Sequence, residues 1–293
     1  MDIRTAKQSN NLLPPSEDGE DRQPLYAAPA LDKGLDILEL LSKQEQGLTR
    51  RDIADRLGRS VSEIFRMVEC LTRRSYLVQA DDTFMLGMKL FELAHEFPPV
   101  SRLLGEALPR MEMLAKTADQ SCHLSVLSGP RQLVVAQVDT PGGMGFSVKI
   151  GTTLDLLKSA SGRVLLAFRD GEETSRLVSL AEPNLGMAEQ KASMRTIAKV
   201  AAQGFAFMKS NQFSGLEAMS YPILDLRGHA IAALTVPYVT RLDDMTRKST
   251  SAVQAELARV AVDLNAALGG IARSRAVTAR VAKPAAKGRL ARP

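Results

Sequence analysis

Hydrophobic residues near the start of the chain recur three or four positions apart, the spacing of helices that bury one face. In the first such run, Leu31, Leu35, Leu38 and Leu41 share one side. They predict a helix over 31–41 with that side buried. The polar residues before it, 1–28, include three prolines and predict a disordered tail.

Two more helical runs follow, each short and each with its own start signal. Residues 49–52 and 60–63 have the form of capping boxes, in which a hydroxyl and an acid three positions later satisfy the first N–H groups of a helix. The second helix carries apolar residues on one face and polar ones on the other: Ser62, Arg66, Glu69 and Arg73. This pairing is typical of a helix-turn-helix that reads the major groove of DNA.

A strand-like pattern comes next. Residues 76–79 and 84–86 predict two strands, and residues 80–83 predict the turn between them. Three helices followed by a hairpin is the order of a winged helix-turn-helix. The tip of this wing carries Asp81 and Asp82, which argues against a strong phosphate contact there.

The rest of the chain mixes strands and helices. Residues 89–96 predict a short linker helix that two prolines end, and residues 102–118 predict a longer one. Further strands are expected at 122–127, 132–138, 146–148, 216–224 and 229–236, and further helices at 159–168, 172–180, 194–202 and 247–268. Hairpin turns between the strands predict an α+β domain with an antiparallel sheet.

Charge and cysteine content narrow the class of protein. The net charge is +5, but seven basic residues and no acid lie in 271–293, so the body is close to neutral. That tail is either an arm that adds salt-sensitive affinity for nucleic acid or a solubilising end. With two cysteines and neither a membrane span nor a signal peptide, we expect a cytoplasmic protein.

The residues of catalytic or metal-binding chemistry form no set. Cys122 and His123 are adjacent on a predicted strand and therefore point to opposite faces. His95, His123 and His229 are far apart and lack the spacing of metal ligands. We expect structural roles for the three histidines, no metal and no cofactor.

Several short motifs, in this order and spacing, resemble the IclR family of transcriptional regulators. The resemblance spans about residues 30–270. In the first domain it rests on ALDKGL at 30–35, GLT at 47–49, IADRLG at 53–58 and RMV at 66–68. In the second it rests on GTTL at 151–154, SASGRVLLA at 159–167, GFA at 204–206 and PILDLRG at 222–228.

The resemblance implies a winged helix-turn-helix domain over 29–88, a linker helix over 89–100 and a GAF-like effector-binding domain over 101–270. It also implies dimers or tetramers on palindromic operators in double-stranded DNA, controlled by a small molecule. The family usually has Ser-Thr early in the recognition helix, where this chain has Ser62-Glu63. That departure predicts a different base preference.

The candidate DNA-contact residues lie on the two capped helices and at their ends: Thr49, Arg50, Arg59, Ser60, Ser62, Glu63, Arg66 and Arg73. Arg66 can make a bidentate contact to guanine or clamp a phosphate, and the alternative is a solvated arginine. Ser60 and Ser62 can meet a phosphate or simply cap the helix. We favour Glu63 as a cap partner over Glu63 as an acceptor from cytosine.

The candidate effector residues come from the family register: Phe146, Leu154, Ala160, Ser161, Met208, Ala218, Thr235 and Pro237. Their apolar members could equally be plain core. As a set they are short of charge, so we expect an apolar or aromatic effector, held partly by N–H groups near Ala160 and Ser161.

We therefore expect a ligand-responsive transcriptional regulator and not an enzyme. One alternative is a small-molecule enzyme with an accessory helix-turn-helix, which a nucleophile–base set or a metal cluster would favour. Another is a structural nucleic-acid-binding protein that depends on the basic tail.

Overall fold

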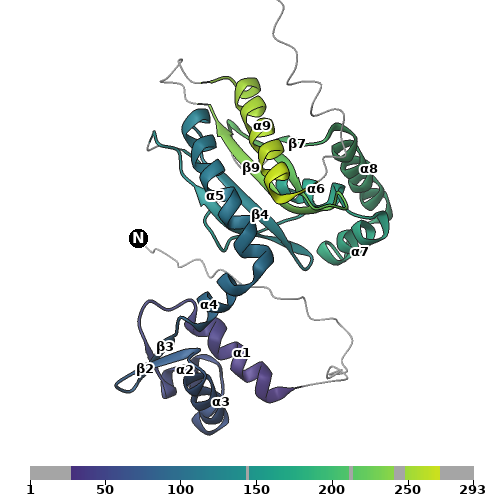
Figure 1. The fold of residues 1–293 in the computed structure, drawn as a ribbon. Coiled ribbons are helices and arrows are strands. Elements are labelled where there is room, and N and C mark those ends of the chain that lie inside the picture. The colour runs from purple at the N-terminus through teal and green to yellow at the C-terminus, as the bar shows by residue number, and fades with distance from the viewer. Residues whose placement is uncertain (1–27, 143–144, 211–213, 241–247, 271–293) are drawn as a thin grey trace, which may run out of the picture. The chain divides into compact units, whose positions relative to one another are not determined.

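A computed structural model of the protein describes residues 28–142, 145–210, 214–240 and 248–270. These residues fall into two compact units that divide between Glu96 and Phe97 (Figure 1). The two predicted tails, apart from Ala28, lie outside the described residues.

The first unit is a winged helix-turn-helix. Its elements are α1 (Pro29–Leu41), β1 (Leu48–Thr49), α2 (Arg50–Arg56), α3 (Val61–Arg73), β2 (Leu77–Ala80), β3 (Thr83–Leu86) and α4 (Lys89–Glu96). The strands pair antiparallel in the order β1-β3-β2, so the predicted hairpin is confirmed and gains the short strand β1. Apolar side chains from α1, α2, α3 and the strands close one core around Ile37, Ile53, Ile64 and Phe84.

Both predicted capping boxes are present. The Thr49 hydroxyl accepts the Asp52 N–H at the start of α2, and the Ser60 hydroxyl accepts the Glu63 N–H at the start of α3. Each carboxylate in turn accepts the backbone N–H of its cap residue. The cap sequences therefore fix where both helices begin.

The predicted buried face of α1 is wrong. Gly34, Ile37 and Leu41 are the buried residues of this helix, whereas Leu31 is 61% exposed and Leu35 is 48% exposed. The apolar stripe of α1 is wider than the surface it covers, and the partner helix α3 selects which line of the stripe is buried.

The second unit is an antiparallel sheet with helices on both faces. Its elements are α5 (Pro98–Ala118), β4 (Cys122–Ser128), β5 (Arg131–Val138), β6 (Thr153–Leu154), α6 (Ala160–Ala167), α7 (Gly171–Ala181), α8 (Met187–Gln203), β7 (Ala206–Lys209), β8 (Leu216–Leu224), β9 (Ala230–Val239) and α9 (Thr250–Leu268). The strand order is β6-β5-β4-β9-β8-β7. The α+β class with an antiparallel sheet is confirmed.

Two helix layers cover opposite faces of this sheet (Figure 1). On one face, α5 and α9 pack together over a core that includes Cys122, Leu124 and Leu234. On the other face, α6 packs on β8 and β9 and is itself covered by α7 and α8. Alternate residues of each strand therefore serve two different cores.

One predicted strand is absent. Residues 146–148 have no regular structure, and the chain joins the sheet edge later, where Thr153 and Leu154 of β6 pair with β5. Both segments alternate apolar and polar residues. Only the pairing partner distinguishes them, because a strand exists through its neighbour's hydrogen bonds.

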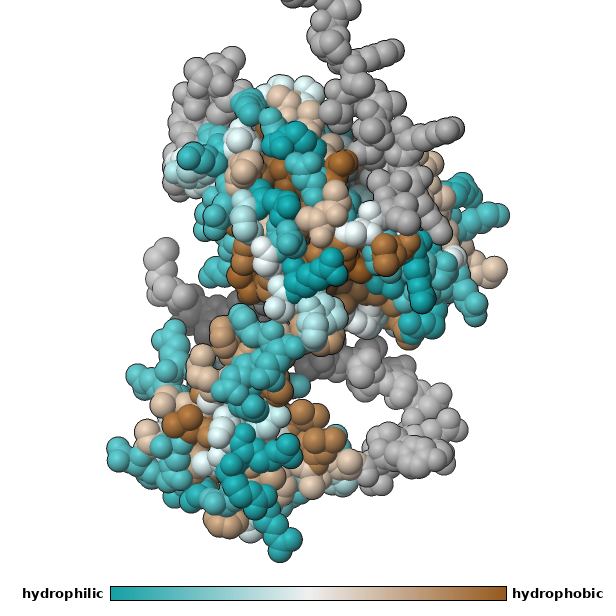
Figure 2. Space-filling model, viewed as in Figure 1, coloured by the Kyte–Doolittle hydropathy of each residue, from teal (hydrophilic) through white to brown (hydrophobic). Residues whose placement is uncertain are grey.

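Figure 2 shows hydrophobic side chains among hydrophilic ones on the visible surface of both units. Among the helices in the described ranges, none is long and apolar enough to cross a membrane. Within the same ranges, no group of three or more acidic, cysteine or histidine side chains could hold a metal ion.

Candidate functional site

The recognition helix α3 presents the polar face that its sequence predicts. Ile64 and Val68 are fully buried, while Ser62, Arg66, Glu69 and Arg73 are exposed. The helix therefore shows solvent a row of polar side chains at the spacing expected for a helix that enters a groove.

Glu63 has the role of a cap partner. Its carboxylate accepts the Ser60 backbone N–H at 2.9 Å and pairs with the Lys33 ammonium at 3.1 Å. The hydrogen bond from the Ser60 backbone, with those from the Ser60 hydroxyl and Lys33, lowers the pKa of Glu63 to about 2. A carboxylate held in this way faces its own helix start and Lys33.

Arg50 and Arg59 are also engaged within their own unit. The Arg50 guanidinium pairs with Glu69 and lies over the rings of Phe65 and Phe84, at 5.2 and 4.9 Å from the ring centroids. Phe65, expected to be partly core, is 46% exposed and serves as a stacking surface for Arg50. Arg59 pairs with Asp36 of α1 at 2.7 Å.

Three candidate side chains on α3 remain turned to solvent. Arg66 takes part in no hydrogen bond or ion pair among the described residues. Arg73 makes only a long contact to the Cys70 sulfur at 3.8 Å, and the Ser62 hydroxyl lies 3.1 Å from that of Ser60. Thr49 is used as the cap of α2.

In the second unit, the sheet register brings four candidate effector residues together. Met208, Ala218 and Pro237 stand directly opposite one another on β7, β8 and β9. Thr235 stands two residues before Pro237 on the same face, opposite Ser220. These residues face α6, because Met208 and Ala218 pack against the core that α6 forms with the sheet.

The remaining candidates surround this face less closely. Ala160 and Ser161 are buried in the first turn of α6, which Ser159 caps. Leu154 is on the far edge strand β6, and Phe146 lies in the irregular segment before it.

A glycine sets how closely α6 approaches the loop that precedes it. A side chain at Gly162 would meet the Leu156 backbone oxygen at 2.3 Å, so this turn of helix requires glycine. Beside it, the amide of Gln132 reaches from β5 to the Asp155 carbonyl at 3.0 Å and to the Ser159 hydroxyl, and the Ser125 hydroxyl donates to its oxygen. A buried polar chain thus connects β4, β5 and the start of α6.

His123 is the residue that the sequence arguments missed on this face. It stands opposite Thr235 on the neighbouring strand and is only 4% exposed. Burial lowers the pKa of His123 to about 4, so the imidazole is neutral at physiological pH. Cys122 points to the other core, where burial raises the pKa of its thiol to about 12. The predicted opposition of Cys122 and His123 is confirmed.

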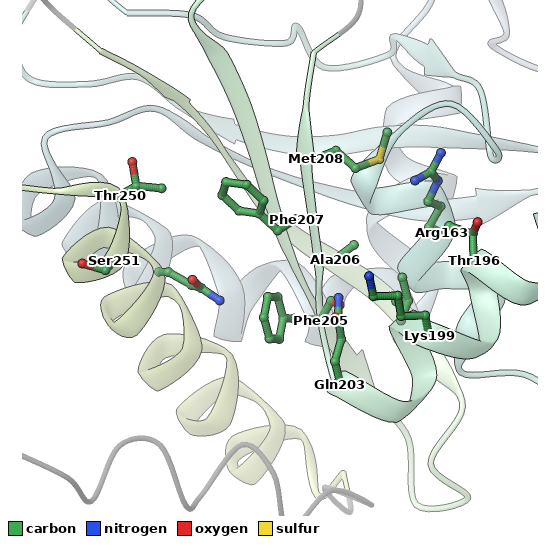
Figure 3. Close-up of a pocket in the computed structure, with 12 residues that line it drawn as sticks. Arg163, Thr196, Lys199, Gln203, Phe205, Ala206, Phe207, Met208, Thr250 and Ser251 are labelled. Carbon is green, nitrogen blue, oxygen red and sulfur yellow. The ribbon is translucent and has the colours of Figure 1, made fainter.

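A hollow of about 550 Å³ opens beside the edge strand β7 (Figure 3). Figure 3 shows Phe205 and Phe207 on the side of β7 toward α9, and Met208 on the side of Arg163. Of the eight candidate effector residues, only Met208 lines this hollow. His123 lies three strands further into the sheet, roughly 14 Å away at about 4.8 Å per strand.

A winged helix-turn-helix joined to a helix-covered antiparallel sheet is the architecture of a DNA-binding regulator with a separate sensor unit. Family models agree: residues 30–81 match the IclR helix-turn-helix domain, and residues 100–266 match the C-terminal domain of the bacterial transcriptional regulator IclR. The chain therefore belongs to the IclR family of transcriptional regulators, which are not enzymes.

Curated relatives are regulators of the same kind. The chain is 27% identical over 237 residues to the HTH-type transcriptional regulator BhcR of Paracoccus denitrificans, covering 78% of this chain and 85% of the relative. It is 25% identical over 227 residues to the regulator KdgR of Escherichia coli, covering 75% of this chain and 85% of KdgR.

A solved structure supports the fold. It is an IclR homologue from Microbacterium hydrocarbonoxydans in complex with 4-hydroxybenzoate, with a TM-score of 0.67 and 24% identity. The match covers 82% of this chain and 99% of the homologue. At that identity the likeness establishes the fold alone.

Proposed function

We propose that this chain acts in the cytoplasm as a homodimer, or a pair of dimers, that binds a palindromic operator through α3. Two recognition helices related by a two-fold axis match two half-sites about one helical turn apart, roughly 34–36 Å. Arg66 is the base-contacting residue of α3, with Ser62 and Arg73 beside it. Thr49, Arg50, Arg59, Ser60 and Glu63 act indirectly, because their side chains hold the helices in place.

The observation that carries this proposal is the uncommitted guanidinium of Arg66. An exposed arginine on a recognition helix, with no partner of its own among the described residues, is free to make a bidentate contact to guanine. The other arginines discussed above have partners that compete with DNA.

The second part of the proposal places the effector on the α6-side face of the sheet. Met208, Ala218 and Pro237 offer it an apolar surface, and the homologue in complex with 4-hydroxybenzoate supports a small aromatic ligand. The effector favours one arrangement of the dimer over another, and it changes operator affinity by the ratio of its affinities for the two.

The test begins with selection of high-affinity duplexes from a random library by the full-length protein. We expect a palindromic sequence. Arg66→Ala should weaken binding to it by about 1–3 kcal/mol, roughly 5- to 150-fold, and relax specificity at one position of each half-site. Fluorescence anisotropy measures both.

The matched control is Arg176→Ala, which removes an exposed arginine from α7. It should leave operator affinity unchanged. Selection that yields no preferred sequence, or Arg66→Ala binding as tightly as wild type, would contradict the proposal. Native mass spectrometry of the complex tests the dimer.

A further inference from the structure

His123 is a buried polar side chain without a partner. Both ring nitrogens are inaccessible to solvent, and neither makes a hydrogen bond within the part of the chain that the structure describes. Burying a polar group in this way costs about 1–3 kcal/mol relative to a satisfied one. Such a group in a folded protein requires an explanation, and a missing ligand is one.

The neighbours of His123 on its own face are already satisfied. Thr235, directly opposite on β9, shares a hydrogen bond of 2.9 Å with Ser220. Gln137, directly opposite on β5, donates to Asp139 at 2.5 Å. Ser125, two residues along β4, donates to Gln132 at 3.0 Å. The hydrogen-bonding capacity of the imidazole is therefore left for a molecule from outside the chain.

The surroundings favour an anionic group over a cationic one. No carboxylate is buried among the described residues, and His123 is the single buried side chain there that can carry positive charge. An imidazole can donate to a carboxylate and strengthens that bond if it takes up a proton. A carboxylate placed here would meet a donor and two hydroxyls, and no described buried acid to repel it.

The next row on the same face is apolar. Two residues beyond Thr235 and Ser220 come Pro237 and Ala218, with Met208 at the end of the row. The face thus presents a polar row beside an apolar row, one residue pair apart, which suits a ligand with a carboxylate at one end and a flat apolar body.

We propose that His123 binds the carboxylate of the effector, and that the effector is a small monocarboxylic acid with an aromatic or flat apolar body. Thr235 and Ser220 flank the carboxylate, and Met208, Ala218 and Pro237 contact the body. This assignment rests on the proposed function, in that it takes the α6-side face as the effector site. It adds the anchoring residue and the chemical class of the ligand.

Isothermal titration calorimetry on the full-length protein tests the assignment, with benzoate and 4-hydroxybenzoate as probes and benzamide as their uncharged counterpart. We expect wild type to bind at least one acid and to bind benzamide at least tenfold more weakly. His123→Phe should weaken acid binding at least tenfold. The matched control, His229→Phe in the same unit, should stay within twofold of wild type.

Thermal melting separates a ligand contact from a structural residue. Because His123→Phe removes an unsatisfied buried group, the ligand-free variant should melt at or above the wild-type temperature, whereas loss of a structural residue would lower it by several degrees. Should the variant fail to fold, ring-nitrogen NMR of wild type replaces it. The chain has three histidines, and saturating acid should shift the His123 signals and leave those of His95 and His229 in place.

The possible failures are distinguishable. Acid binding that His123→Phe leaves intact, or saturation without a shift of the His123 signals, overturns the role of His123 while the regulator remains. A wild type that binds an operator through Arg66 but binds neither acid overturns the ligand class. Absence of a preferred operator overturns the proposed function itself, whatever the acids do.

Discussion

Each unit carries a row of polar side chains, and the two rows are opposite in kind. The row on α3 is exposed, and its members at Arg66 and Arg73 are polar groups that water satisfies. The row across β4, β9 and β8 is buried, and His123 in it has no partner. The exposed row can be presented at almost no energetic cost, whereas the buried row reduces stability until a ligand fills it. Function is thus written in the first unit by exposure and in the second by incomplete satisfaction.

The largest expected effect tests the buried row by pH. The folded pKa of His123, about 4, is below its unfolded value of 6.5, so the unfolded chain binds a proton that the folded chain refuses. Stability should therefore fall as the pH drops from 6.5 to 4, by up to roughly 3 kcal/mol from this group. Urea unfolding followed by circular dichroism measures it.

His123→Phe is the comparison for that experiment, because it should remove this part of the pH dependence. His229→Phe should retain it. Equal slopes in wild type and His123→Phe would mean that the buried imidazole is not held neutral, and the contrast between the two rows would be lost.

A smaller effect separates the structural arginine from the solvent-facing one within the first unit. Arg50→Ala should destabilise the protein by about 1–2 kcal/mol, because Arg50 stacks on Phe65 and Phe84 and pairs with Glu69. Arg66→Ala should change stability by less than about 0.5 kcal/mol. Thermal unfolding of the two variants side by side gives the difference.

The same pair should behave in the opposite way toward DNA. Arg66→Ala should lose operator affinity, and Arg50→Ala should retain it once the protein is folded. If the two arginines changed stability equally, the division of the first unit into supporting and contacting side chains would be wrong.

The smallest effect concerns the exposed carboxylate that caps α3. Glu63→Gln should lower the melting temperature at pH 7, because the folded pKa of Glu63 is about 2 against an ordinary 4.5. A lowered pKa gives stability that is present above pH 4.5 and disappears as the pH falls toward 2. The melting temperatures of variant and wild type should therefore converge over that window, and a difference that persists at pH 2 would assign it to packing.

Much of the first unit was predictable because its signals are local. The capping boxes at Thr49 and Ser60, the apolar spacing of Ile64 and Val68 and the hairpin turn each depend on a few neighbouring residues. The buried side of α1 was not predictable, since its stripe offered two lines of leucine and α3 chose between them.

The candidate ligand site was only half predictable. Thr235, Met208, Ala218 and Pro237 followed from the family register, and the structure places them on one face. His123 did not, because the feature that distinguishes it is the absence of a partner. That property depends on every neighbour at once, and on strands more than a hundred residues apart in sequence.

The sequence by itself determined the order of elements, the helix starts, the family and the polar face of α3, because those depend on residues within one or two turns of each other. Only the tertiary structure decided which arginines are engaged by partners and which histidine is enclosed without one. Pairing of Arg50 with Glu69, and of β4 with β9, joins segments whose contact no local pattern specifies.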